Sequence, residues 1–127
     1  VGSPFKVFEV EGFTIWVGKS AKDNDEMLRN FVHKDDLWLH ARQVPGSHVI
    51  IRKKGMPAVP QQVVERAASL AAFYSKLKTD SLSPVIVTEV KFVRKVKGSA
   101  PGSVVVDREK VILVGPKGPD QDTASNA

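Results

Sequence analysis

The feature that most constrains this chain is one amphipathic segment, residues 60–77, set among apolar runs too short to be helices. Val63, Ala67 and Leu70 recur at helical spacing along one stripe of this segment. Pro60 suits the first helical position, since its missing N–H would have no intrahelical partner there. The alanines of the stripe allow close packing, so we expect this helix to lie on a sheet.

The short apolar runs predict strands, and their order predicts antiparallel pairing. They occupy residues 5–10 with 13–17, 37–42 with 48–53 across a Pro45-Gly46 turn, 85–90, and a last hairpin of 103–106 with 110–114. A short helix follows Gly18 through Met27 and Phe31, with Asp23, Asn24 or Asp25 as its cap. The predicted fold class is α+β, a mostly antiparallel sheet with one long and one short helix.

The 127 residues fit one domain, with residues 1–4 as a remnant of cloning, 5–114 as the folded part and 115–127 as a disordered tail. No cysteine is present, which excludes disulfides, thiolate zinc sites and cysteine nucleophiles. No apolar run approaches the ~20 residues that cross a bilayer. We expect a soluble, cytoplasmic domain with no membrane partner and no cofactor. The sequence leaves its oligomeric state open.

Positive charge is concentrated in the middle of the chain. Residues 37–106 carry eleven Lys and Arg against three Asp and Glu, whereas the two flanking parts are slightly acidic. This distribution suits a polyanionic partner, although a solvated basic face without a partner is equally compatible with it.

The segment 36–48 holds the densest set of reactive side chains. If residues 37–42 form a strand, Trp38, His40 and Arg42 share one face, opposite Leu37, Leu39 and Ala41. An aromatic ring, an imidazole and a guanidinium on one sheet face can stack an unpaired base and neutralise a phosphate. Ser47, His48 and Arg52 lie on the returning segment. The alternative is that Trp38 is a core residue and that both histidines only hold the turn.

A second candidate site is the basic connection after the strand at 85–90. Lys91, Arg94, Lys95 and Lys97 repel one another unless a polyanion offsets their charge, and Gly98, Pro101 and Gly102 let backbone approach a phosphate. Gly18-Lys19 is a weaker candidate, either a backbone anion nest or a simple turn into a capped helix.

Two other functional classes remain open. Asp36, His40 and His48 could bind a metal or act with Ser47 in a small hydrolase, with His33 as a further ligand, although no recognised ligand spacing is present. Residues 91–97 could instead dock an acidic protein.

Taken together, these segments resemble the RNA-binding domain of the NFACT family, the C-terminal module of ribosome quality-control factors also named fibronectin-binding proteins. The matching stretches are Gly18-Lys19 with Asn24-Asp25, Asp36-Leu37-Trp38-Leu39-His40-Ala41, Pro45-Gly46-Ser47-His48, Ala67-Ala68, residues 71–76, Arg94-Lys95, Lys97-Gly98 and Pro101-Gly102. Lys19 stands where the family pattern has arginine and Val96 where it has proline.

The resemblance implies an RNA-binding module without catalysis of its own, which binds tRNA or rRNA on the large ribosomal subunit. Together with the charge and strand patterns above, which supply Arg42, Arg52 and Lys91, it gives these RNA-binding candidates: Lys19, Trp38, His40, Arg42, Ser47, His48, Arg52, Lys91, Arg94, Lys95 and Lys97. It points to Gly18, Asn24, Asp25, Asp36, Pro45, Gly46, Gly98, Pro101 and Gly102 as residues that build the motif. The other domains of the long factors are absent from this chain, so the sequence does not decide between an excised domain and a single-domain relative.

Overall fold

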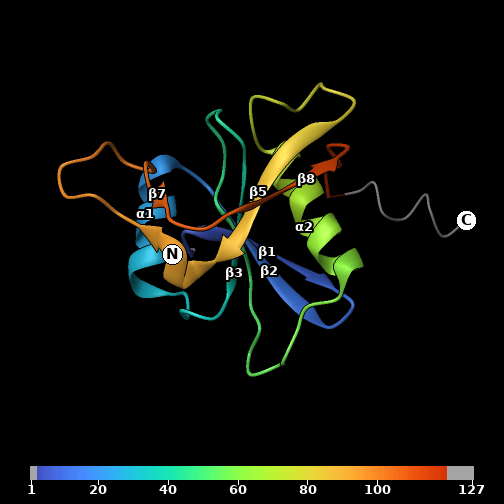
Figure 1. Ribbon diagram of the computed structural model, residues 1–127, viewed down its shortest axis with the longest axis horizontal. Helices are drawn as coiled ribbons and strands as arrows, with labels where there is room; N and C mark the ends of the chain where they lie inside the picture. Colours follow the sequence, from blue (N-terminus) through green and yellow to red (C-terminus); the bar gives the residue numbers. More distant parts are fainter. Residues whose placement is uncertain (1–2, 120–127) are drawn as a thin grey trace, which may run out of the picture.

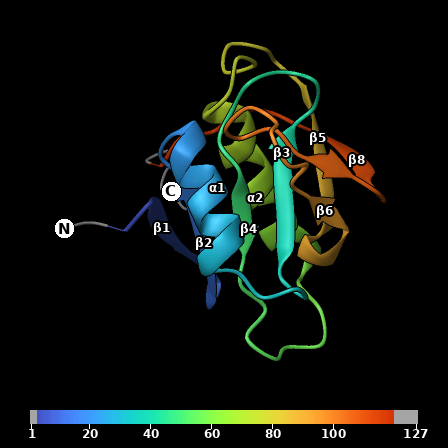
Figure 2. The same cartoon turned by 90° about the vertical axis from the view of Figure 1, so that its left-hand side faces the viewer.

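The computed structural model describes residues 3–119, and a six-stranded antiparallel sheet of order β1-β2-β4-β3-β5-β8 runs through its middle. The two helices lie on opposite faces of this sheet, α1 in front and α2 behind in Figure 2. The elements are β1 (Phe5–Val10), β2 (Phe13–Gly18), α1 (Ala21–Asn30), β3 (Leu37–Ala41), β4 (Val49–Ile51), α2 (Gln61–Phe73), β5 (Ser83–Glu89), a 3-10 turn (Val90–Phe92), β6 (Val93–Arg94), β7 (Val105–Val106) and β8 (Lys110–Val114). The predicted α+β class is confirmed.

The helix α2 lies against the sheet (Figure 1), and the main core fills the space between this helix and one face of the sheet. Alternate residues of each strand supply it, as the period of two in the sequence requires. Leu39 of β3 and Val49 and Ile51 of β4 are fully buried there with the alanine-rich face of α2. The expected packing of a small-residue helix on the sheet is therefore observed.

A second core fills the other face of the sheet, and it corrects the expectation of an open ring-bearing face. Trp38 lies on that face as the alternation predicts, but its side chain is only 2% exposed and packs with Met27 of α1, Ile50 of β4, and Val104 and Val106. The sequence pattern places Trp38 opposite the main core but does not indicate that α1 and the β6–β7 pair cover it.

The helix α2 ends at Phe73, four residues before the predicted end. Tyr74 leaves helical geometry with φ −93° and ψ 38°. The next backbone groups instead bond to the Pro45 segment: Ser47 N–H donates to the Tyr74 carbonyl at 3.0 Å, and Lys76 N–H donates to the Pro45 carbonyl at 3.1 Å. The helix ends here because its next backbone groups bond to the Pro45–Ser47 segment, which is distant in sequence, rather than to one another.

The predicted last hairpin is wrong, because its two strands belong to different sheets. β7 pairs with β6 in a separate two-stranded sheet, and β8 pairs with β5 at the edge of the large one. Asp107 N–H donates to the Phe92 carbonyl at 2.8 Å, and its carboxylate accepts two bonds from Arg94 at 2.7 and 3.1 Å. These bonds hold the end of β7 on β6, so the chain reaches the large sheet only afterwards.

Residues 115–119, which the sequence analysis assigned to a disordered tail, contact α2. Lys117 N–H donates to the Ser69 carbonyl at 3.2 Å, and the Arg66 guanidinium donates to the carbonyls of Lys117 and Gly118. A β-carbon at Gly118 would lie 2.7 Å from the nearest ring carbon of Phe73, so the chain can approach α2 this closely because the residue is glycine. Residues 1–2 and 120–127 of the predicted remnant and tail lie outside the described residues. None of the helices in residues 3–119 is long and apolar enough to span a membrane.

Candidate functional site

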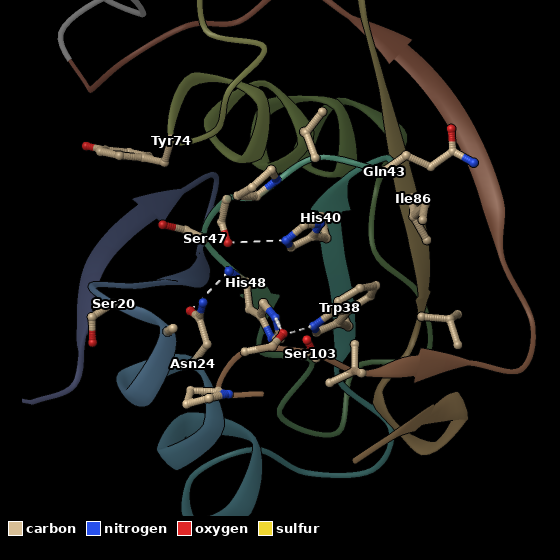
Figure 3. Close-up of a pocket in the computed structure, with 18 residues that line it drawn as sticks. Ser20, Asn24, Trp38, His40, Gln43, Ser47, His48, Tyr74, Ile86 and Ser103 are labelled. Atoms are coloured by element: carbon tan, nitrogen blue, oxygen red, sulfur yellow. Dashed lines mark hydrogen bonds between the residues drawn. The ribbon is translucent and has the colours of Figure 1, made fainter. Parts of the chain in front are cut away.

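A pocket of about 740 Å³ lies beside the ends of β3 and β4, and most of the motif residues surround it (Figure 3). The start of α1, the turn between β3 and β4, the end of α2 and the loop before β7 form its walls. It is lined by Ser20, Ala21, Asn24, Trp38, His40, Gln43, Val44, Pro45, Gly46, Ser47, His48, Tyr74, Ile86, Pro101, Gly102, Ser103, Val104 and Val106.

The floor of this pocket is a chain of buried hydrogen bonds centred on His48. The Trp38 indole Nε1–H donates to His48 Nδ1 at 3.1 Å, so Nδ1 is unprotonated and Nε2–H donates to the Gly102 carbonyl at 2.9 Å. Burial, reinforced by the neighbouring His40, lowers the pKa of His48 from 6.5 to about 3. His48 is therefore a neutral bridge between the sheet and the Gly102 loop.

His40 lies next to this bridge and is half-buried. Its ring is parallel to that of Trp38, with centroids 5.6 Å apart, and perpendicular to that of His48 at 5.2 Å. Nδ1 lies 2.6 Å from the Ala41 carbonyl oxygen and Nε2 lies 3.2 Å from that of Gly46. Burial lowers the pKa of His40, so the ring is neutral at physiological pH and donates to only one of these carbonyls.

The first turns of α1 hold two segments of the pocket in place, the backbone at His48 and the Gly102 loop. Asn24 Oδ1 accepts from His48 N–H at 3.1 Å, and Asp25 Oδ1 accepts from Gly102 N–H at 3.0 Å. A β-carbon at Gly18 would lie 1.8 Å from Asn24 Oδ1, which explains the glycine there. Ser20, rather than a residue of the Asp23-Asn24-Asp25 run, caps the helix by accepting from Asp23 N–H at 3.1 Å.

The Pro45-Gly46-Ser47 turn closes the pocket against the end of α2. Gly46 forms a β-bridge with Ser75, and a β-carbon at Gly46 would lie 2.7 Å from that of Ser75. This close approach requires glycine, and the turn consequently places Ser47 on the pocket wall.

Asp36 does not belong to the pocket. It lies at the start of β3, 1% exposed, and accepts from Arg52 Nε at 2.8 Å and from the backbone N–H groups of His33 and Lys53. The hypothetical set of Asp36, His40 and His48 therefore does not converge. Within residues 3–119, no group of three or more His, Asp or Glu side chains is arranged to hold a metal.

Four of the predicted RNA-binding cations have carboxylate partners. Arg52 binds Asp36 and stacks on the Trp16 ring at 4.2 Å. The other three pairs are Lys91 with Glu89, Arg94 with Asp107, and Lys95 with Asp25 at 3.2 Å. The Arg94 bond lowers the pKa of Asp107. The mutual repulsion expected for this basic segment is thus offset within the molecule at Lys91, Arg94 and Lys95, but not at Lys97 within the described residues.

Three other predicted cations are exposed and, within the described residues, make no ion pair: Lys19, Arg42 and Lys97. Lys19 precedes Ser20, and Arg42 precedes Gln43, so both flank the pocket lining. Arg42 lies just beyond β3, in the turn, rather than on the strand face. Of the two alternatives for Gly18-Lys19, the structure has the simple turn rather than the anion nest, because Gly18 N–H donates to the His48 carbonyl and Lys19 N–H donates to that of Pro4.

Sequence reasoning did not assign Ser20, Gln43, Tyr74 or Ser103 to a site. Each lines the pocket from a different segment, and none belongs to a charged or reactive cluster. Gln43 carries a conformational signal instead: its φ of 60° is in the left-handed region, which non-glycine residues rarely adopt. That signal exists only in the structure. Gly98, a predicted motif residue, has a φ of 83° and open space around it, so a turn alone requires it.

Comparisons with known proteins show which family the chain belongs to. The chain is 38% identical over 112 residues to the Rqc2 homolog RqcH of Bacillus subtilis and 37% identical over 114 residues to that of Streptococcus suis. These matches cover 88% and 89% of this chain but only 19% and 20% of the relatives, so the chain spans about a fifth of their length.

A solved structure of the C-terminal part of the fibronectin/fibrinogen-binding protein from Streptococcus suis superposes with a TM-score of 0.85 at 32% identity. It covers 99% of this chain, which in turn covers 49% of that one. The model of the NFACT protein RNA binding domain matches residues 4–108, which include both helices and every residue lining the pocket. The chain belongs to the NFACT protein RNA-binding domain family.

Proposed function

We propose that this domain binds RNA at the pocket between β3, β4 and α1, and that Lys19 and Arg42, which adjoin its lining, contact the phosphates together with Lys97, in the loop before Pro101. The observation that carries the proposal is that some of the candidate cations have a carboxylate partner and others have none. Lys19, Arg42 and Lys97 make no ion pair within residues 3–119, whereas the other candidate cations are compensated by carboxylates. An uncompensated cation gains the most from a phosphate.

The candidate residues then divide by role. Lys19, Arg42 and Lys97 contact phosphates, and Ser47 and His40 face the ligand from the wall. Trp38 and His48 are positioning residues, because both are buried and hydrogen-bonded to one another. Arg52 has a structural role at Asp36, and Lys91, Arg94 and Lys95 add weaker attraction from paired positions.

The context of binding follows from the relatives. We propose that the domain acts in ribosome-associated quality control in the cytoplasm, as a non-catalytic module that binds tRNA or rRNA on the large ribosomal subunit. The geometry gives no support to the hydrolase alternative: in the described structure both nitrogens of His48 are occupied by Trp38 and Gly102, and the bonds of His40 go to backbone carbonyls rather than to Ser47.

The test is the salt dependence of RNA binding. Fluorescence anisotropy with labelled tRNA and with a ribosomal RNA fragment gives the slope of log affinity against log salt. Replacing Lys19, Arg42 and Lys97 with alanine should flatten this slope by about two to three units, about one for each lost phosphate contact.

A matched control removes the same charge elsewhere. Lys34, Lys110 and Lys117 are exposed and lie outside the pocket lining. Their alanine triple variant should retain most of the slope. Equal losses in both triple variants would contradict the proposed location, and no binding of either RNA at low salt would contradict RNA binding itself. Recovery of an acidic protein partner from nuclease-treated lysate, with no RNA binding, would favour the protein-docking alternative.

A further inference from the structure

We infer that the pocket receives the base of a single unpaired nucleotide. The phosphates on either side of this nucleotide then lie against Lys19 and Arg42, which adjoin the pocket wall. This inference rests on the proposed RNA binding and adds what the pocket itself recognises. It differs from the expectation of a base stacked on an open sheet face, because that face is covered by α1 and the β6–β7 pair.

The size and lining of the pocket fit a base. Its volume of about 740 Å³ is within the range of small-molecule sites, about 300–1,000 Å³. No acidic, lysine or arginine side chain lines it. The half-buried ring of His40, which is parallel to the buried Trp38 ring, and the side chain of Ile86 supply aromatic and apolar surface. The interior is therefore neutral, whereas Lys19 and Arg42 adjoin its wall: a ligand with a flat uncharged part and an anionic part matches both regions.

The wall also carries unused hydrogen-bonding groups. Gln43, Ser47 and Ser103 line the pocket, and within residues 3–119 their side chains make no hydrogen bond. The deeper polar residues differ, since Asn24 accepts from His48 N–H and the His48 ring donates to the Gly102 carbonyl. The amide of Gln43 can donate and accept, as the edge of a base requires. Its left-handed backbone is the kind of local strain that persists at ligand sites.

The occupant must be unpaired. In an A-form duplex the bases are stacked and their pairing edges are bonded to the opposite strand. The pocket can therefore receive a base only after that base has left the stack. A bulge, a loop or a single-stranded end meets this condition without the free-energy cost of opening a pair.

The experiment compares short RNA duplexes that differ at one position. One carries a single bulged nucleotide, tested with each of the four bases, and its partner carries an abasic residue at the bulge with the same charge. We expect the duplex with the favoured base to bind about five- to 150-fold more tightly than the abasic one. In the ¹H–¹⁵N spectrum, the indole N–H resonance of Trp38 should shift with the base, whereas that of Trp16, outside the pocket, should not.

The substitution Gln43→Gly removes the amide but suits the backbone, because glycine adopts a positive φ readily. It should reduce the ratio of bulged to abasic affinity. Glu11→Gly is the matched control, because Glu11 also has a positive φ (49°) but does not line the pocket. This substitution should leave the ratio unchanged.

Equal affinity for the bulged and abasic duplexes, with an unmoved Trp38 resonance, would overturn base insertion and leave RNA binding intact. Binding of neither duplex at low salt would instead overturn the proposed function and this inference with it.

Discussion

The substitution Trp38→Phe tests whether the buried indole is a structural donor. The change keeps an aromatic ring in the second core but removes the N–H that bonds to His48 Nδ1 at 3.1 Å. His48 is 1% exposed, and its Nε2–H is already committed to the Gly102 carbonyl, so a tautomer change cannot rescue Nδ1. An orphaned buried acceptor costs about 1–3 kcal/mol. The lost ring volume adds to this, and we expect unfolding free energy to fall by about 2–4 kcal/mol.

The assay is a double-mutant cycle measured by urea unfolding. In the Trp38→Phe background, His48→Leu removes the orphaned acceptor, so the double variant should be less destabilised than the sum of the two single variants by about 1–3 kcal/mol. Additivity within about 0.5 kcal/mol would refute the reasoning, because it would mean that the two side chains act independently. The ¹H–¹⁵N spectrum of each single variant serves as the control that the fold is retained.

Three further predictions concern the same framework. Because burial lowers the pKa of His48 to about 3, the unfolded state binds a proton first as pH falls below 6.5, so stability should drop by up to about 1.4 kcal/mol per pH unit between about 6.5 and 3. Urea unfolding across this range should show a shallower slope for His48→Gln; parallel slopes would contradict a neutral bridge. Gly18→Ala places a carbon against Asn24 Oδ1 and should cost about 1–3 kcal/mol by breaking the bond to His48 N–H, measured by thermal unfolding; an unchanged melting temperature would count against this clash. Asp36→Asn leaves the partly exposed Arg52 without its carboxylate and should cost about 2–4 kcal/mol by chemical unfolding, with RNA affinity per folded molecule unchanged; a loss of affinity in the folded variant would place Asp36 at the ligand instead.

Much of the fold could be predicted from local patterns because each strand has one face on the main core. The alternation of Leu37, Leu39 and Ala41 is sufficient to orient β3, and Pro60 is sufficient to locate the start of α2 within one residue. The same patterns do not specify partners distant in sequence. They did not predict that α1 covers Trp38, or that β7 pairs with β6.

The site was predictable as a set of residues but not as a surface. Charge counting identifies the basic segment, yet the carboxylates that compensate Lys95 and Arg94 are Asp25 and Asp107, on other parts of the chain. Gln43 gives no sequence signal because an uncharged side chain in a turn is unremarkable until its backbone angle is known. The proposed division between phosphate-contacting and positioning residues therefore required the tertiary structure.

The most direct test of the central claim is a map of where RNA touches the domain. Ultraviolet cross-linking of bound tRNA and ribosomal RNA, followed by mass spectrometry of the cross-linked peptides, reports contact without substitution. We predict cross-links in residues 19–22 and 42–47, which line or adjoin the pocket, and in residues 97–103, the loop that contributes Pro101, Gly102 and Ser103 to it. Cross-links confined to the outer face of α2 or to the β8 edge would contradict it.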